Sequence, residues 1–169
     1  RYLRGELVEP AKPIVFYIEN STPYRWRKYI KQGIEDWQVA FERAGFKNAI
    51  IAKEITDSMT VDMDDVNYSV LTYAASTKAN AMGPSILDPR SGEILEADIM
   101  WWHNVLNMLQ EWITVQTGTV RPEARGIKLS DELMGDAMRF VACHEVGHSL
   151  GLRHNMMGSW AFPTDSLRS

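Results

Sequence analysis

Large apolar residues recur along the chain at two spacings, and these spacings predict most of its secondary structure. Residues 13–18 are rich in β-branched and aromatic side chains, which favours a strand. Between residues 24 and 44 the large apolar side chains fall three or four positions apart. This spacing predicts one amphipathic helix, and Gly45 is suited to end it.

The rest of the chain is predicted to alternate between short strands and helices. Residues 49–52 and 68–74 are strand candidates, and residues 81–87 and 94–101 form a candidate hairpin around a turn at 88–92. A short helix is expected over 105–113. A longer helix is expected from Ser130, which can cap it, to about Leu150, after which Gly151 can end it.

Composition narrows the class of protein. The 169 residues suit one domain, and a hydrophobic fraction of 45% with 24% charged residues is typical of a globular chain rather than a disordered one. Because 22 acidic residues outnumber 18 basic ones, the chain lacks the basic field of a nucleic-acid binder. We expect no membrane span, since no apolar run is long enough. Cys143 is the sole cysteine, so an internal disulfide is excluded.

The residues that carry chemistry lie in the last predicted long helix. On a helix that turns about 100° per residue, His144 and His148 lie roughly 40° apart and one turn along the axis, so both imidazoles can reach one metal ion. Glu145 is displaced sideways, so its carboxylate can reach a water beside the metal without taking a ligand position. This spacing predicts a metal-assisted hydrolytic site.

A third histidine tests this interpretation. If the helix continued, His154 would face about 240° away from His148. Gly151 allows a left-handed turn, so the chain can bring His154 back to the same ion. Three imidazoles with one open position are typical of a catalytic Zn²⁺ site rather than a structural one.

The segment 144–154 resembles the extended zinc signature of the metzincin metalloproteases. Segments 13–20, 83–95 and 151–155 resemble more narrowly the bacterial Met-zincin group of large exported zinc-dependent metalloproteases. The resemblance implies zinc ligands His144, His148 and His154, with Glu145 as general base and acid. It implies an α/β (α+β) fold: a twisted mixed sheet with one antiparallel edge strand, a long backing helix and the zinc-binding helix. It also implies an extracytoplasmic location.

The same resemblance implies a peptide or protein substrate bound along the edge strand by strand addition. Residues 81–87 are our candidate for this edge. Within them we expect substrate contacts from Ala81, Met82, Gly83, Pro84 and Ser85. The oligomeric state is left open.

Metzincins also carry a methionine turn beneath the metal. Met156 and Met157 follow His154 too closely to form it, so we interpret them as local packing and expect the turn beyond Ser169. The chain is therefore expected to be a fragment of one catalytic domain, with an upper part at 1–151 and the start of a truncated lower part at 152–169.

The function predicted is zinc-dependent hydrolysis of peptide bonds, and two alternatives stay open. One is a catalytically silent zinc-binding module or truncated fragment, against which the retention of Glu145 argues. The other is a metal-dependent hydrolase acting on something other than peptides.

The remaining candidate residues are expected to have structural rather than functional roles. His103 is expected to be structural, and Cys143 a small buried hydrophobe. An acidic loop is expected to be solvated rather than to hold calcium, because its spacing lacks the glycine of a recognised calcium loop; its residues are Asp62, Asp64 and Asp65.

Overall fold

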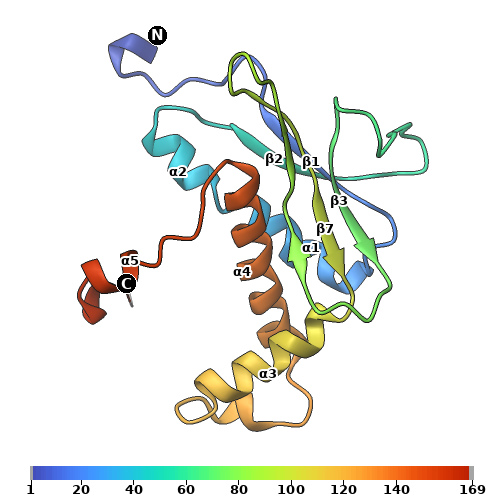
Figure 1. Ribbon diagram of the computed structural model, residues 1–169, viewed down its shortest axis with the longest axis vertical. Helices are drawn as coiled ribbons and strands as arrows, with labels where there is room; N and C mark the ends of the chain where they lie inside the picture. The colour runs from blue at the N-terminus through green and yellow to red at the C-terminus, as the bar shows by residue number, and fades with distance from the viewer. Residues whose placement is uncertain (1, 168–169) are drawn as a thin grey trace.

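A mixed five-stranded sheet forms the centre of the computed structural model, which describes residues 2–167 (Figure 1). The strands run in the order β2–β1–β3–β7–β4. Adjacent pairs among the first four are parallel, and β4 pairs with β7 in the antiparallel direction. The fold class predicted from the sequence is confirmed. The strand bounds are β1 Ile14–Ile18, β2 Ile50–Glu54, β3 Ser69–Ala74, β4 Ala81–Met82 and β7 Ile99–Trp102.

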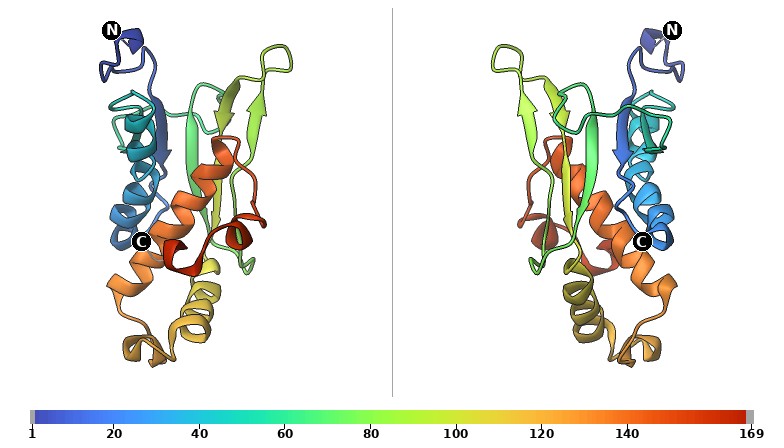
Figure 2. Two further views of the ribbon diagram at one scale, coloured as in Figure 1. Left: turned by 90° about the vertical axis from the view of Figure 1, so that its left-hand side faces the viewer. Right: turned by 90° about the vertical axis from the view of Figure 1, so that its right-hand side faces the viewer.

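A separate hairpin is formed by β5 (Ser85–Leu87) and β6 (Ile94–Ala97). Both side views show it projecting beyond the main sheet, at the end opposite α3 (Figure 2). The antiparallel edge strand is therefore shorter than predicted. It ends at Met82 because Gly83 and Pro84 interrupt the extended run, and proline has no N–H to donate to a ladder.

Five α-helices complete the described chain: α1 Tyr24–Glu35, α2 Gln38–Arg43, α3 Val105–Thr117, α4 Asp131–Ser149 and α5 Gly158–Ala161. Short 3₁₀ segments lie at Tyr2–Arg4, Pro122–Arg125 and Thr164–Leu167. In α4 the predicted cap is present, since the Ser130 side chain accepts a hydrogen bond from the Leu133 N–H. No helix in the range 2–167 has the length and apolarity needed to cross a bilayer.

The single helix predicted over residues 24–44 is broken at Asp36 and Trp37, so that prediction was wrong in its length. Both residues at the break bond to α4. The Asp36 carboxylate accepts two hydrogen bonds from the Arg139 guanidinium, at 2.7 and 2.5 Å. The Trp37 indole N–H donates to the Cys143 carbonyl at 2.8 Å. The break between α1 and α2 thus lets Asp36 and Trp37 bond to α4 at Arg139 and Cys143, one helical turn apart.

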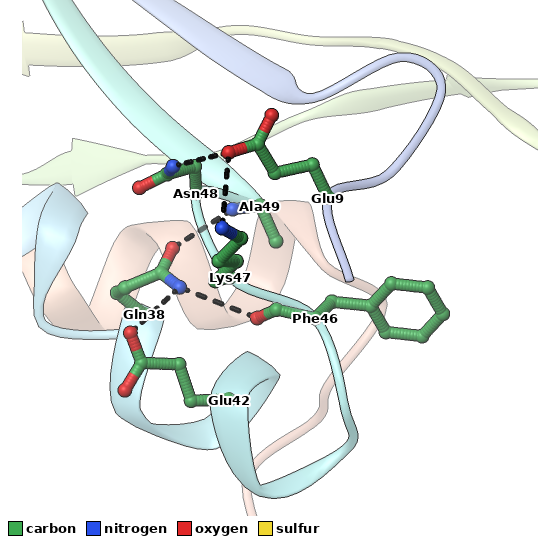
Figure 3. A network of polar contacts seen from close by, with 7 residues as sticks. All are labelled: Glu9, Gln38, Glu42, Phe46, Lys47, Asn48 and Ala49. Atoms are coloured by element: carbon green, nitrogen blue, oxygen red, sulfur yellow. Dashed lines mark hydrogen bonds and ion pairs between the residues drawn. The ribbon is translucent and has the colours of Figure 1, made fainter. Parts of the chain in front are cut away.

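A polar network fixes the connection from α2 to β2 and ties the N-terminal segment to it (Figure 3). The Gln38 side chain donates to the Phe46 carbonyl and accepts from the Ala49 N–H. Asn48 donates to the Glu9 carboxylate at 3.0 Å. The chain before β1 is thereby held on the β2 side of the sheet.

The core lies between the sheet and the α1–α4 pair. Fully buried side chains come from all three: Phe16, Ile18, Ile30, Ile34, Leu71, Ile99, Trp101, Met138 and Val146. Two glycines let the helices approach closely. A Cβ atom on Gly33 would lie 2.3 Å from the Arg139 carbonyl oxygen of α4, and one on Gly135 would lie 2.3 Å from the Tyr29 ring of α1.

We predict that Gly33→Ala lowers the free energy of unfolding by about 1–3 kcal/mol, because the new methyl group overpacks the helix contact. At an unobstructed helix position the same change would stabilise by about 1 kcal/mol, so the sign itself is diagnostic. Urea unfolding measures the sign and the size of the change in the free energy of unfolding. Gln32→Ala, at an exposed position of the same helix, is the control and should change stability by less than about 0.5 kcal/mol. A stabilised Gly33→Ala protein would contradict the close contact.

Candidate metal centre

Three histidine side chains converge at the C-terminal end of α4. His144 and His148 lie one turn apart on the helix, and His154 comes from the loop that follows it. The Nε2 atoms of all three pairs are 3.1 Å apart. The three imidazoles therefore point at one common position.

The loop returns because the helix ends at a glycine in the left-handed conformation. Gly151 has a φ of +90°, and the Leu152 N–H donates to the Gly147 carbonyl at 3.0 Å, as in a Schellman motif. The chain leaves the end of α4 in a new direction and runs away from it to α5 (Figure 1). His154 lies within this turn rather than on the far side of a longer helix.

Hydrogen bonding alone does not account for the triangle of nitrogen atoms. Each imidazole Nε2 carries one in-plane position, which holds either a proton or a lone pair. It cannot donate to one neighbour and accept from the other at once, so three mutual contacts of 3.1 Å cannot all be satisfied. A cation at the centre would satisfy all three lone pairs.

The spacing also fits a metal ion. Nitrogen ligands at 2.0–2.1 Å around a tetrahedral zinc ion are separated by about 3.3–3.4 Å. The observed separations of 3.1 Å lie within a few tenths of an ångström of that value. In the described part of the chain, this trio is the one group of three or more His, Cys, Asp or Glu side chains close enough to hold a metal.

Hydrogen bonding and burial prepare two of the imidazoles as ligands. His148 Nδ1 lies 2.9 Å from the Leu152 carbonyl oxygen, to which its N–H donates, so the lone pair is left on Nε2. Burial, followed by the charges of His148 and His154, lowers the pKa of His144 below its ordinary value. Both effects favour the neutral form that binds metal.

Glu145 is the buried acid beside this cluster. Its side chain is only 7% exposed, and it makes no hydrogen bond within residues 2–167. Burial raises the pKa of its carboxyl group, while His148 and His154 act in the opposite direction. An unpaired buried carboxylate is costly to a fold, so its presence indicates a role other than stability.

A cleft of about 780 Å³ contains Glu145 and all three histidines. One wall is the β4 edge, from which Ala81, Met82, Gly83 and Pro84 line the cleft. Ser85, the fifth predicted substrate residue, is outside this lining and instead pairs with Ala97 in the hairpin.

The other wall of the cleft is apolar and was not anticipated from the sequence. It is formed by Val105, Met108 and Trp112 of α3 together with Phe140 and Val141 of α4. The apolar spacing over 105–113 predicted a helix there, but which side chains would face the histidines depended on how α3 packs against α4.

Gly83 brings the two walls together. A Cβ atom at this position would lie 2.7 Å from the Glu145 carbonyl oxygen and 2.9 Å from Ser149 Oγ. Ser149 Oγ in turn donates to that carbonyl at 3.0 Å. Glycine is therefore needed for the edge of the sheet to approach the helix that carries Glu145.

The remaining candidates lie elsewhere. His103 Nδ1 lies 2.7 Å from the Tyr73 hydroxyl, outside the histidine cluster. Cys143 is partly buried, and burial raises the pKa of its thiol, which disfavours the reactive thiolate. Asp62 and Asp64 are exposed. Met156 and Met157 are also exposed, so our interpretation of both as local packing was wrong.

We predict that Gly151→Ala weakens metal binding about 10- to 100-fold, because a left-handed φ is strained for alanine and the turn positions both His154 and the Leu152 carbonyl. Titration of zinc against a chromophoric chelator measures the affinity. Gly92→Ala is a matched control, since Gly92 has a φ of +75° in open space within the remote hairpin turn. Equal affinities for the two variants would contradict the role of this turn.

Comparison with known proteins agrees with the geometry. The model of a family described as Met-zincin matches residues 126–169, which include Glu145 and all three converging histidines. No curated protein and no solved structure gives a significant match. Residues 126–169 are therefore similar to the Met-zincin family, and the mixed sheet with its antiparallel edge is consistent with a metzincin-like fold.

Proposed function

We propose that this chain carries the catalytic centre of a zinc-dependent endopeptidase. One observation carries the proposal: three imidazole nitrogen atoms 3.1 Å apart share a cleft with a buried, unpaired glutamate. His144, His148 and His154 would hold the zinc ion. The resemblance of the chain to Met-zincins supports peptide bonds as its substrate class. The same resemblance supports a bacterial origin and export from the cytoplasm.

The proposed roles divide between the metal and the side chains. Zinc, when bound, supplies a Lewis acid that polarises a carbonyl group and acidifies water. Glu145 accepts the proton of the attacking water and delivers it to the leaving amine. Its position in a largely apolar cleft suits this work, because burial makes its carboxylate a stronger base than an exposed glutamate.

The edge of the sheet is suited to hold the substrate. In the described sheet β4 is terminal, so one side of Ala81 and Met82 has no strand beside it. An extended peptide would bond to this side and lie across the histidines, as strand addition requires. Gly83, through its close contact with Glu145, would keep the peptide backbone near the base.

The alternative of a catalytically silent zinc module is less well supported. Three histidines alone would serve such a module, and a carboxylate buried beside them would only reduce its stability. The cleft between β4 and α3 would also have no purpose there.

Glu145→Gln should lower the rate of peptide cleavage about 10²- to 10⁴-fold while leaving zinc affinity unchanged, because the amide cannot act as a base but no ligand is lost. Cleavage of a quenched fluorescent peptide library and zinc titration measure the two effects. Glu132→Gln, an exposed change in the first turn of α4, is the control. A wild-type protein that binds zinc but cleaves no peptide would favour the silent module.

The apolar wall predicts a preference at the cleavage site. We expect peptides with a large apolar side chain beside the cleaved bond to be preferred about 10- to 100-fold over alanine, because that side chain is buried in the cleft. Trp112→Glu should remove this preference and favour lysine or arginine. Trp112 is 48% exposed, so folding should tolerate the change, and Val115→Glu on the exposed side of α3 is the control. An unchanged profile in Trp112→Glu would exclude α3 as a substrate wall.

A further inference from the structure

The sheet has a gap one strand wide between β1 and the hairpin strand β6, on the other side of β7 from the β4 edge. The third strand begins late: Ser69, the first residue of β3, is level with Phe16 of β1. On the other side Leu71 is level with Ile99 of β7. Ile14 and Val15 of β1, with residues 12–13 before them, and residues 94–96 of β6 therefore extend past the start of β3, the strand that separates β1 from β7.

A cavity of about 470 Å³ lies at this gap. It is lined by residues 12–17 and 93–97, and by Asn67 and Ser69 where β3 begins. One residue of an added strand occupies about 160 Å³, from a strand spacing near 4.8 Å, a rise near 3.3 Å and a layer thickness near 10 Å. The cavity thus has room for about three residues. That number agrees with the length of β6, residues 94–96, that has no β3 residue beside it.

A backbone N–H group of β1 points across the gap. The Ile14 N–H donates to the Ala49 carbonyl on the β2 side of β1. Because successive residues of a strand point their N–H groups to opposite sides, the Val15 N–H points into the gap. The described chain before β1 does not fill the space, since Val8 pairs with Phe46 and Glu9 bonds to Asn48 on the β2 side (Figure 3).

The lining of the gap is acidic. Glu96 of β6 is 8% exposed, and Glu93, which directly precedes β6, also lines the cavity. Burial, followed by the adjacent carboxyl group of Asp98, raises the pKa of Glu96. Lys12 is the only lysine or arginine among the lining residues of this cavity. Because the group beside Glu96 is the acid Asp98 rather than a basic residue, an incoming ammonium or guanidinium group would offset the charge of this pair.

We propose that this gap is a second binding site, which takes an extended peptide segment carrying lysine or arginine as an additional strand between β1 and β6. Backbone pairing supplies the orientation, and Glu96 and Glu93 supply the preference for basic side chains. Ser149 and Leu150, which follow His148, also line the cavity, so a bound segment would contact the end of the metal-binding helix.

The test is direct binding, measured by fluorescence anisotropy with a labelled, capped Val-Lys-Val-Lys-Val peptide. The Glu145→Gln protein is used so that the probe is not cleaved, and the result does not depend on whether the chain is a peptidase. We expect saturable binding that is about 10- to 100-fold tighter than that of the Val-Glu-Val-Glu-Val peptide, because charge-assisted hydrogen bonds are lost in the latter. N-methylation of alternate residues of the probe should abolish binding.

Two variants and one hydrogen-exchange experiment test whether the peptide binds in the gap between β1 and β6. In the same background, Glu96→Gln should weaken binding of the lysine peptide about tenfold or more, whereas Glu111→Gln on exposed α3 should not. Hydrogen exchange should show protection of residues 12–17 and 93–97 on binding. Equal affinity for the two peptides, or protection confined to residues 81–84, would overturn the proposal, since binding would then be unselective or at the β4 edge.

Discussion

Two glycines let α1 and α4 approach until the backbone of one helix meets atoms of the other, and the metal centre depends on this contact. With Gly33 against the Arg139 carbonyl and Gly135 under the Tyr29 ring, no side chain can separate the helices. The Asp36–Arg139 pair and the Trp37–Cys143 hydrogen bond then fix α4 along its axis. These constraints set the rotation of the helix that carries His144 and His148.

The rotation of α4 decides what lies on each of its sides. On one side Glu145 is directed into the cleft between β4 and α3, where Gly83 allows the sheet edge to approach. At its end the left-handed Gly151 returns the chain, so that one turn supplies both His154 and the carbonyl that orients His148. The donors thus hold their positions through backbone geometry, before any metal is considered. Such preorganisation is what a catalytic metal site requires.

The metal centre could be predicted from the sequence because it depends on residues that lie close together along the chain. The spacing of His144 and His148, and a glycine before His154, depend only on helix geometry, and the cap at Ser130 is equally local. The mixed sheet with its antiparallel edge was also predicted, but from the Met-zincin resemblance rather than from local spacing. The break in the helix over residues 24–44 was not, because it depends on bonds from Asp36 and Trp37 to residues more than a hundred positions away. The α3 wall and the gap beside β3 were missed for the same reason: both arise where segments distant in sequence meet.

We infer that three imidazoles hold one metal ion and leave it open to substrate. X-ray absorption at the zinc edge, on protein loaded with one zinc per chain, tests this most directly. We predict three imidazole nitrogen ligands at about 2.0–2.1 Å, with a light-atom ligand completing the shell and no sulfur ligand. A sulfur ligand from Cys143, or fewer than three imidazoles, would contradict it.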